Sequence, residues 1–204
     1  MIGIVDYGSG NIAAIATIYK QLRVPYIVSG SPTELAAADR YILPGVGNFD
    51  TVMNDLARLD IIAMLNDEVI GKGKMAMGIC VGMQILASSS EEGDSRGLGW
   101  VPGRVRRIDA SWLNRAPKLP HMGWNSITST GPSSIFDGVD QERGFYFLHS
   151  YHFDAESRDD IIATVSYGGD LACGVRRKNV YGFQFHPEKS HGNGIAIFKN
   201  FAEI

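Results

Sequence analysis

The sequence is poor in cysteine, and this scarcity excludes two classes of protein. Its 204 residues include two cysteines, Cys80 and Cys173, which lie far apart and form no Cys-x-x-Cys motif. A zinc cage or a disulfide framework needs more cysteines at closer spacing. We therefore expect no metal site and no disulfide, and we expect the chain to work in a reducing compartment.

An excess of positive charge and a long apolar run are also missing. Lys and Arg total 19 against 22 Asp and Glu, which gives a formal net charge of −3, so there is no broad basic surface for a nucleic-acid partner. No apolar run approaches the length that spans a bilayer. Residues 2–6 are typical of a buried strand rather than of a signal peptide. We expect a cytoplasmic protein with no nucleic-acid and no membrane partner.

What the sequence does contain is an ordinary globular composition, with 45% apolar and 20% charged residues. A chain of this length can bury a sizeable core in one domain. Since no internal repeat or linker-like tract divides the sequence, residues 1–204 are predicted to form a single domain.

The first half of the chain alternates short apolar runs with segments of helical periodicity. The expected strands are residues 2–6, 25–29, 40–43 and 75–79, and the expected helices are residues 12–22, 33–38 and 50–70, the last as one helix or two. Alternating strands and helices with short connections predict a parallel sheet with helices on both sides.

Beyond about residue 97, strand-like segments follow one another across glycine-rich turns. The expected strands are residues 99–108, 121–128, 144–149, 161–167, 172–176 and 181–186, and residues 195–202 are expected to form a closing helix. The fold class is therefore predicted to be α/β, an open and mostly parallel sheet flanked by helices and extended by antiparallel strands.

Two glycine-containing segments match nucleotide motifs only in part. Residues 8–13 read G-x-G-x-x-A between a predicted strand and a helix, but no acidic residue ends the second strand to hold a ribose. Residues 71–74 contain two lysines but lack the spacing of a phosphate-binding loop. We interpret the first segment as a tight turn, and we expect no bound cofactor.

The most informative motif, Gly78-Ile79-Cys80-Val81-Gly82, places a cysteine between glycines at the end of a predicted strand and the start of a helix. This is the arrangement of a nucleophile elbow with sulfur in place of oxygen. Glycines permit a cramped turn, and the N–H groups that begin a helix favour a thiolate and can hold an oxyanion. Cys80 is therefore predicted to be a nucleophile rather than a buried structural cysteine.

A nucleophile needs a base and a group that orients the base. His186 follows an apolar strand, and Glu188 lies two residues further on. That spacing lets the carboxylate reach the imidazole, so Cys80, His186 and Glu188 are predicted to form a catalytic triad. His149 and His152 are close in the chain, but no further Cys or His cluster accompanies them, and we expect no metal there.

These motifs together resemble the class I glutamine amidotransferases, whose hallmark is a Cys-His-Glu triad on such a sheet. Within that family, the chain resembles the glutaminase subunits of imidazole glycerol phosphate synthases. The matching strings run nearly end to end and comprise residues 6–11, 43–49, 78–84, 120–125, 145–151 and 185–190.

The resemblance implies that the chain hydrolyses L-glutamine to glutamate and ammonia. Cys80 would attack the side-chain amide and form a thioester, and His186 would protonate the departing ammonia and later activate water. Glu188 would orient His186 and stabilise its charged form.

The remaining site residues come from the same reasoning. The backbone N–H of Val81 and an N–H from the loop that contains Val46 and Gly47 would hold the oxyanion, after a peptide flip in that loop. By the resemblance, the residues placed to bind glutamine are Gly47, Gln84, His149, Ser150 and Tyr151.

The resemblance also implies a protein partner. Such glutaminase subunits form a heterodimer with a (β/α)8 barrel cyclase, to which they pass ammonia. The barrel makes imidazole glycerol phosphate and an aminoimidazole carboxamide ribotide in histidine biosynthesis. By the same likeness, the face that carries Asn11, Trp124 and Lys189 would contact the barrel.

Three other interpretations remain open. Val81, residues 97–106 and residues 189–191 also resemble a paralogous branch that supplies ammonia for amidation of a surface-polysaccharide sugar. A stand-alone thiol hydrolase is disfavoured by the glutamate two residues after His186, and a non-catalytic binding module is disfavoured by the complete triad.

Overall fold

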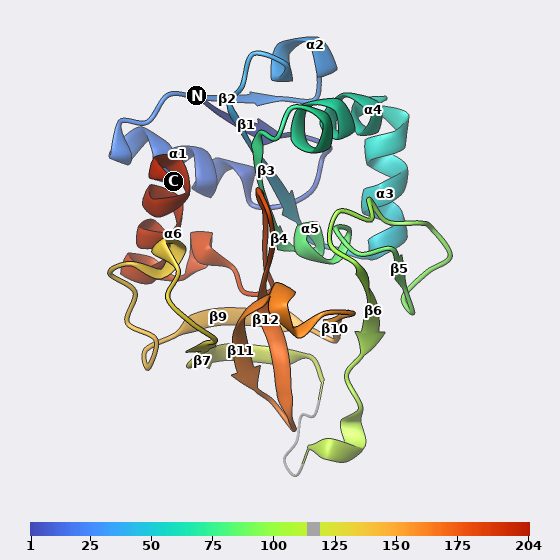
Figure 1. Ribbon diagram of the computed structural model, residues 1–204, viewed down its shortest axis with the longest axis vertical. Coiled ribbons are helices and arrows are strands. Elements are labelled where there is room, and N and C mark those ends of the chain that lie inside the picture. Colours follow the sequence, from blue (N-terminus) through green and yellow to red (C-terminus); the bar gives the residue numbers. More distant parts are fainter. Residues whose placement is uncertain (114–118) are drawn as a thin grey trace.

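A sheet of eleven strands runs through the molecule (Figure 1). The computed structural model describes residues 1–113 and 119–204. Five neighbouring strands are parallel, as expected from the first half of the sequence. In spatial order they are β2 (Tyr26–Ser29), β1 (Ile2–Val5), β3 (Arg40–Gly45), β4 (Met75–Cys80) and β13 (Val180–Phe183). β1 and β13 are buried along their whole length, which is typical of strands covered on both faces.

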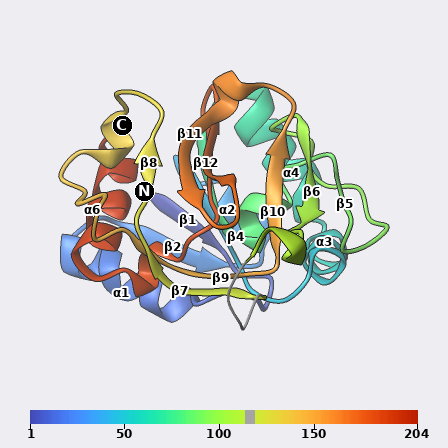
Figure 2. The same ribbon diagram turned by 90° about the horizontal axis from the view of Figure 1, so that it is seen from below.

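Helices cover both faces of these parallel strands (Figures 1 and 2). One face carries α1 (Ile12–Leu22) and α6 (His191–Glu203), and the other carries α3 (Phe49–Arg58), α4 (Ile61–Leu65) and α5 (Val81–Gln84); the short α2 (Pro32–Leu35) follows β2. Tyr19 of α1 packs edge-on against Phe198 of α6, with ring centroids 5.5 Å apart. Both residues are fully buried, so the two terminal helices share one part of the core.

Beyond β13 the sheet continues with antiparallel strands. Next to β13 lie, in order, β12 (Asp170–Arg177), β10 (Tyr151–Ala155), β6 (Gly103–Arg107) and β5 (Ser89–Ser90), and β11 (Ile161–Ser166) pairs with β12 and with β8 (Thr128–Ser129). β5 pairs with β6 in parallel. The mostly parallel sheet with antiparallel extensions confirms the fold class expected from the sequence.

A second, two-stranded sheet lies across the end of the large one (Figures 1 and 2). It consists of β7 (His121–Asn125) and β9 (Phe145–His149) in antiparallel register, with His121 opposite His149. Alternate residues of β9 are buried, whereas in β7 only His121 is buried and Met122 and Trp124 are exposed. The remaining short turns are a π-helical turn at Asn66–Gly71 and 3₁₀ turns at Ala110–Trp112, Ser134–Phe136, Arg158–Asp160 and Pro187–Lys189.

The structure corrects several expected boundaries. Residues 50–70 form two helices, because the chain turns at Asp60, whose φ of 54° is left-handed, and they end in the π-helical turn. The strand β10 was not expected, and the strand expected over residues 121–128 is two separate strands, β7 and β8. Residues 99–102 precede β6 instead of belonging to it, and α6 begins at His191, four residues before the expected start.

Candidate active site

The turn between β4 and α5 holds Cys80 in a backbone conformation that is rare for a residue with a side chain. Its φ is 55° and its ψ is −112°. A Cβ on Gly82 would lie 1.8 Å from the carbonyl oxygen of Leu43, and a Cβ on Gly78 would lie 2.2 Å from the carbonyl oxygen of Gly82. Both distances are far below van der Waals contact. The turn can therefore pack against β3 only with glycine at position 82, and it can close on the end of β4 only with glycine at position 78.

The neighbouring strand brings a histidine to the same edge of the sheet. β13 pairs in parallel with β4, with Gly182 opposite Gly78, and the chain then reaches His186 at the end beside Cys80. A 3₁₀ turn folds Glu188 back onto the imidazole, and Nδ1 of His186 lies 2.9 Å from Oε1 of Glu188. Both side chains are 2% exposed. The spacing of two residues therefore gives the histidine–carboxylate contact that the sequence predicted.

Burial and charge act in opposite directions on His186. Burial by itself lowers the pKa of the imidazole, but hydrogen bonds to Cys80 and Glu188 outweigh it and raise the pKa to about 10. A histidine with this pKa is positively charged at neutral pH. The pair can therefore stabilise negative charge on the sulfur and deliver a proton to a leaving group.

A cavity of about 290 Å³ opens at this edge of the sheet. Its lining residues are Val46, Gly47, Cys80, Val81, Gln84, Glu92, Pro120, Leu148, His149, Ser150, Tyr151, His186 and Lys189. The structure thus brings together the predicted nucleophile, base, oxyanion-loop and glutamine-binding residues, which are up to 140 positions apart in the chain, from Val46 to His186. Glu188 lies behind His186 instead of in the cavity wall.

Two polar groups beneath and beside the sulfur were not identified from the sequence. The fully buried Gln184 directs its Nε2 at Sγ of Cys80 over 3.7 Å, and its Oε1 accepts a hydrogen bond from Nε2 of Gln84 at 3.1 Å. The carbonyl oxygen of Leu148 lies 3.8 Å from the same sulfur. Gln84 also donates to the carbonyl oxygen of Tyr151 at 3.3 Å, so it joins two walls of the cavity.

Glu92 is a second residue that sequence reasoning missed. Its carboxylate lines the cavity, and Oε2 accepts the backbone N–H of Phe49 at 2.9 Å. Burial, more than the nearby charge of Asp50, raises its pKa, and the hydrogen bond from Phe49 acts against this shift. Glu92 lies in a loop twelve residues after Cys80, and no motif spacing in the sequence indicates that it reaches the cavity.

The two backbone N–H groups predicted to hold the oxyanion are placed differently. Val81 is the first residue of α5, next to the sulfur. The N–H of Val46 instead donates to Oγ of Ser9 at 3.0 Å, and the same Oγ donates to the carbonyl oxygen of Val46 at 2.6 Å. We call this pair of hydrogen bonds the Ser9 clasp. In this conformation the Val46 N–H is turned to Ser9 and is not available to an oxyanion.

The clasp depends on the glycine-rich turn after β1. Gly10 has a φ of 91°, and a Cβ there would lie 2.6 Å from Cβ of Pro44. The motif that matches a nucleotide fingerprint thus packs tightly against the end of β3 and carries Ser9 to the loop of Val46. This agrees with its interpretation as a tight turn.

The residues predicted to contact a partner lie around the cavity mouth and on the small sheet. Lys189 lines the cavity, with Nζ 5.7 Å from the centre of the Tyr146 ring. Trp124 is 43% exposed and stacks on His191 at 5.4 Å. Asn11 lies at the start of α1, two residues after Ser9.

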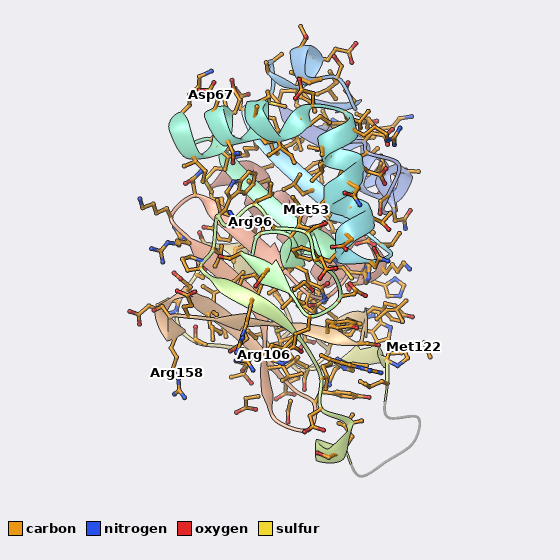
Figure 3. The ribbon with its side chains drawn as sticks, turned by 90° about the vertical axis from the view of Figure 1, so that its right-hand side faces the viewer. Met53, Asp67, Arg96, Arg106, Met122 and Arg158 are labelled. Atoms are coloured by element: carbon orange, nitrogen blue, oxygen red, sulfur yellow. The ribbon has the colours of Figure 1, made fainter. Side chains whose placement is uncertain are left out.

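Exposed apolar side chains lie on the small sheet and beside the cavity. Met122 is 61% exposed and stands at the outer edge of the molecule (Figure 3). It lies opposite Leu148 in the register of the small sheet, and Val46 is 47% exposed beside the cavity. We call Val46, Met122, Trp124 and Leu148 the apolar face.

The other histidines do not form a metal centre. His121 and His149 contact each other in the core, with Nδ1 of the first 2.9 Å from Nε2 of the second. His152 lines a different cavity. Over residues 1–113 and 119–204, no group of three or more His, Cys, Asp or Glu side chains is arranged to hold a metal ion.

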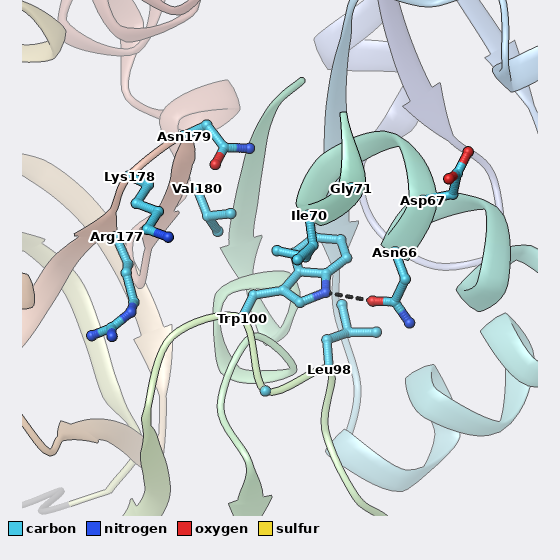
Figure 4. A pocket seen from close by; sticks show the side chains of 11 residues that line it. Asn66, Asp67, Ile70, Gly71, Leu98, Trp100, Arg177, Lys178, Asn179 and Val180 are labelled. Carbon is cyan, nitrogen blue, oxygen red and sulfur yellow. Dashed lines mark hydrogen bonds between the residues drawn. The ribbon is translucent and has the colours of Figure 1, made fainter. Parts of the chain in front are cut away.

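A larger cavity of about 660 Å³ lies elsewhere, where β13 begins. Figure 4 shows the indole of Trp100 in its middle, with Arg177 and Lys178 on the side away from Asp67. Nε1 of Trp100 donates to Oδ1 of Asn66 at 2.7 Å. This cavity contains no cysteine, histidine or serine in its lining, and its charged side chains are Asp67, Arg177 and Lys178.

Comparison with known proteins gives a consistent result. The family model "Glutamine amidotransferase class-I" matches residues 3–204. The chain is 46% identical over 204 residues to imidazole glycerol phosphate synthase subunit HisH of Leptospira borgpetersenii, covering all of both chains. It is 48% identical over 207 residues to the subunit of the same name from Bdellovibrio bacteriovorus, again covering all of both chains.

A solved structure extends the comparison to three dimensions. A glutamine amidotransferase superimposes with a TM-score of 0.74 at 18% identity, covering 100% of this chain and 99% of the other. At this identity the likeness concerns the fold alone. Within the described residues, no helix is long and apolar enough to cross a membrane.

Proposed function

The chain belongs to the class-I glutamine amidotransferase family, and from that premise we propose that it is the glutaminase subunit of an imidazole glycerol phosphate synthase, formed by residues 1–204 as one domain. The observation that carries the proposal is the contact of His186 with Glu188 at 2.9 Å beside Cys80, at the bottom of a cavity. The full-length identity of 46% and 48% to two subunits of that name supports this role over an unrelated thiol hydrolase.

In the proposed reaction, the sulfur of Cys80 attacks the side-chain amide carbon of L-glutamine and forms a C–S bond. The imidazolium of His186, whose pKa is raised to about 10, gives its proton to the nitrogen. The C–N bond breaks, ammonia leaves, and a γ-glutamyl thioester remains. Water then gives a proton to His186 and attacks the thioester, and glutamate is released as the sulfur departs.

Two backbone N–H groups are proposed to hold the oxyanion of the tetrahedral states. Val81 supplies the first, as the residue after the nucleophile. The second comes from the loop of Val46 and Gly47, and it requires that Val46 leave the Ser9 clasp. Gly47 has a φ of 102° and open space where a Cβ would stand, so the loop has room to change its peptide orientation. Loss of one such donor typically lowers the rate by about 10²–10³.

The cavity walls provide groups for the amino-acid end of glutamine. We propose that the carboxylate of Glu92 receives the α-ammonium group, because it is the one acidic side chain among the described residues that line the cavity. Gly47, Gln84 and the wall formed by His149, Ser150 and Tyr151 would bind the remaining polar atoms of the substrate, as the family resemblance implies.

Ammonia released in this cavity needs an acceptor, and no second catalytic centre is evident among the described residues. We propose that the apolar face binds a (β/α)8 barrel cyclase as a heterodimer, with Asn11, Trp124 and Lys189 in the contact. Support comes from the exposure of Met122 at 61% and Trp124 at 43% on β7, the strand that pairs with β9, whose Leu148 lines the cavity. Exposed apolar side chains gathered in this way mark interaction surfaces.

The test measures glutamate released from L-glutamine by the chain alone and mixed with a histidine-pathway barrel cyclase and its ribonucleotide substrate. We expect strong stimulation on mixing, abolished by Cys80→Ala. The matched control is Cys173→Ala, because Cys173 is also a buried free cysteine but lies in β12 outside the cavity.

Two results would contradict the proposal. Turnover that depends on Cys80 but ignores this barrel would indicate the branch that amidates surface-polysaccharide sugars. Absence of turnover in every mixture, with an intact fold, would favour a different thiol hydrolase or a binding module.

A further inference from the structure

A chain of hydrogen bonds runs behind the wall of the cavity. Nδ2 of Asn125 lies 3.2 Å from the carbonyl oxygen of Ser166 and 3.3 Å from Nε2 of His121. Nδ1 of His121 lies 2.9 Å from Nε2 of His149, and Nδ1 of His149 lies 2.7 Å from the carbonyl oxygen of Tyr151. His121 and His149 are 3% and 6% exposed.

The two ends of this chain determine its direction, because backbone carbonyl oxygens only accept. The amide group of Asn125 that faces Ser166 must be the NH2, so Nε2 of His121 accepts and its proton is on Nδ1. At the other end, Nδ1 of His149 must donate to Tyr151, so Nε2 accepts when the ring is neutral. The two ends independently require that His121 donates to His149.

A charged His149 is incompatible with this arrangement. The Nε2–H of a charged His149 would face Nδ1 of His121, so Nδ1 would have to give up its proton. That proton would then have to be on Nε2 of His121, where it would face the NH2 of Asn125. Both rings are therefore neutral and carry their proton on Nδ1.

The charged and titratable surroundings of His149 agree with a neutral ring. His121 faces it from β7, His152 from β10, and the raised-pKa His186 from the end of β13. Burial, followed by the neighbouring His121, lowers the pKa of His149 to about 3. The hydrogen bond to the Tyr151 carbonyl favours the charged form of the ring, but burial and the neighbouring histidines outweigh it.

We infer that His121 is a positioning residue of the glutaminase site: its Nδ1–H holds His149 in one orientation and so fixes the cavity wall of residues 148–151. The inference rests on the proposed function and deepens it. That wall carries the Leu148 carbonyl, 3.8 Å from the sulfur of Cys80, and the Tyr151 carbonyl, which also accepts a hydrogen bond from Gln84. Displacement of the wall therefore disturbs the place where glutamine binds.

The same residue links the cavity to the apolar face. His121 begins β7, and the next residue, Met122, is 61% exposed on the outer side of that strand. His121 is also stacked between Phe147 at 4.6 Å and Tyr167 at 4.0 Å. A rigid contact thus connects the strand that would meet a partner with the wall that would meet the substrate.

The first experiment reads the tautomers directly in the unmodified protein by ¹⁵N NMR of the imidazole nitrogens. We expect protonated Nδ1 and unprotonated Nε2 in both His121 and His149 between pH 6 and 8. A charged His149, or a proton on its Nε2, would overturn the inference. This measurement needs no glutamine turnover, so it stands even if the proposed function fails.

The second experiment compares two substitutions of His121 in glutamate release with the barrel cyclase present. His121→Phe keeps an aromatic ring for stacking but removes the donor, and it leaves the buried Nε2 of His149 without its partner. We expect roughly a tenfold or greater loss of kcat/KM, mainly as a rise in KM, since an unsatisfied buried polar group is costly. His121→Asn places an amide N–H near the position of Nδ1 and should recover most of the loss.

A purely structural role would give a different result. In that case both variants would lower the melting temperature, and KM would stay at the wild-type value in the folded fraction. The control is the rate at which iodoacetamide alkylates Cys80. This rate should be the same in the wild type and in the His121 variants, because His186 and Glu188 are unchanged. If His121→Phe retains the wild-type KM, or if His121→Asn gives no recovery, the positioning role is wrong.

Discussion

Two cavities of this protein lie at opposite ends of the same strands. The smaller one, about 290 Å³, lies where β4 ends at Cys80 and where the chain leaving β13 reaches His186. The larger one, about 660 Å³, lies where β13 begins, beside Asn179 and Val180. The smaller cavity holds the nucleophile and the base, whereas the larger one holds an indole with two cations and the acidic Asp67.

The comparison shows that chemistry follows strand direction rather than cavity size. At the carboxyl end of parallel strands, loops and helix starts converge, and ligands of open α/β sheets bind there. The glycine elbow can project Cys80 at that edge, and the parallel register of β13 with β4 brings His186 beside it. The following predictions test this contrast, from the largest expected effect to the smallest.

His186→Ala should remove almost all glutamine hydrolysis, because it removes the proton donor that the Glu188 carboxylate holds beside Cys80. We expect a loss of kcat on the order of 10⁴-fold or more. The matched substitution at the other cavity is Lys178→Ala, which should leave kcat and KM unchanged. If Lys178→Ala lowered kcat as much as His186→Ala in a glutamate-release assay, the assignment of catalysis to the smaller cavity alone would be wrong.

Glu188→Gln should have a smaller effect on turnover, because the base remains but loses its orienting carboxylate. A loss of about 10²–10⁴-fold in kcat is typical of such a change. It is measured in the same assay, and a variant with wild-type kcat would show that the 2.9 Å contact is not used in catalysis.

The same substitution has a consequence for stability against pH. The pKa of His186 is raised from 6.5 to about 10 in the fold, so the protonated ring stabilises the folded state fully below pH 6.5, and this contribution is lost as the pH rises towards 10. Removing the Glu188 charge should lower that pKa and flatten the dependence. Urea denaturation at pH 6.5, 8 and 9.5 gives the free energy of unfolding at each pH. If this free energy fell equally with pH in the wild type and the variant, the assignment of the raised pKa to the Glu188 contact would be contradicted.

Gly82→Ala should destabilise the fold, because its Cβ would stand 1.8 Å from the carbonyl oxygen of Leu43. Overpacking of this kind costs about 1–3 kcal/mol or more. Gly192→Ala is the control, since that position in α6 has nothing within 4 Å of a Cβ. Thermal unfolding should show a lower melting temperature for the first variant alone, and equal melting temperatures would refute the packing argument.

Trp100→Phe should have the smallest effect. It removes the 2.7 Å hydrogen bond from Nε1 to Asn66 and keeps most of the ring, so we expect a loss of about 1 kcal/mol in the free energy of unfolding. Glutamine turnover should be unchanged, because the larger cavity takes no part in the proposed reaction. A change in KM for glutamine would instead show that a substitution in the larger cavity affects glutamine binding in the smaller one.

The parallel half of the fold and the elbow were predictable, because each depends on short stretches of sequence. β1, β4 and α1 appear at or within one residue of their expected bounds. The contact of His186 with Glu188 follows from a spacing of two residues. Local information is sufficient where one motif or one periodicity determines the conformation.

Other features depend on contacts between distant residues and left no local signal. β10 follows β9 after the single residue Ser150, and its mixed polar sequence hides a strand that pairs with β6. The contact of His121 with His149 arises from the register of β7 with β9 across 28 positions. Glu92 enters the cavity because its loop folds over the start of α3, where it meets the N–H of Phe49.

The Ser9 clasp sets a limit on how much the opening of the Val46 loop alone can stimulate this enzyme. In the proposed mechanism, freeing the Val46 N–H breaks two hydrogen bonds, and at a net value of about 1 kcal/mol each they leave roughly 3% of the molecules in the open conformation. A binding partner that holds every molecule open therefore raises turnover by about thirtyfold through this step. Any stimulation beyond that factor has to come from elsewhere in the cavity.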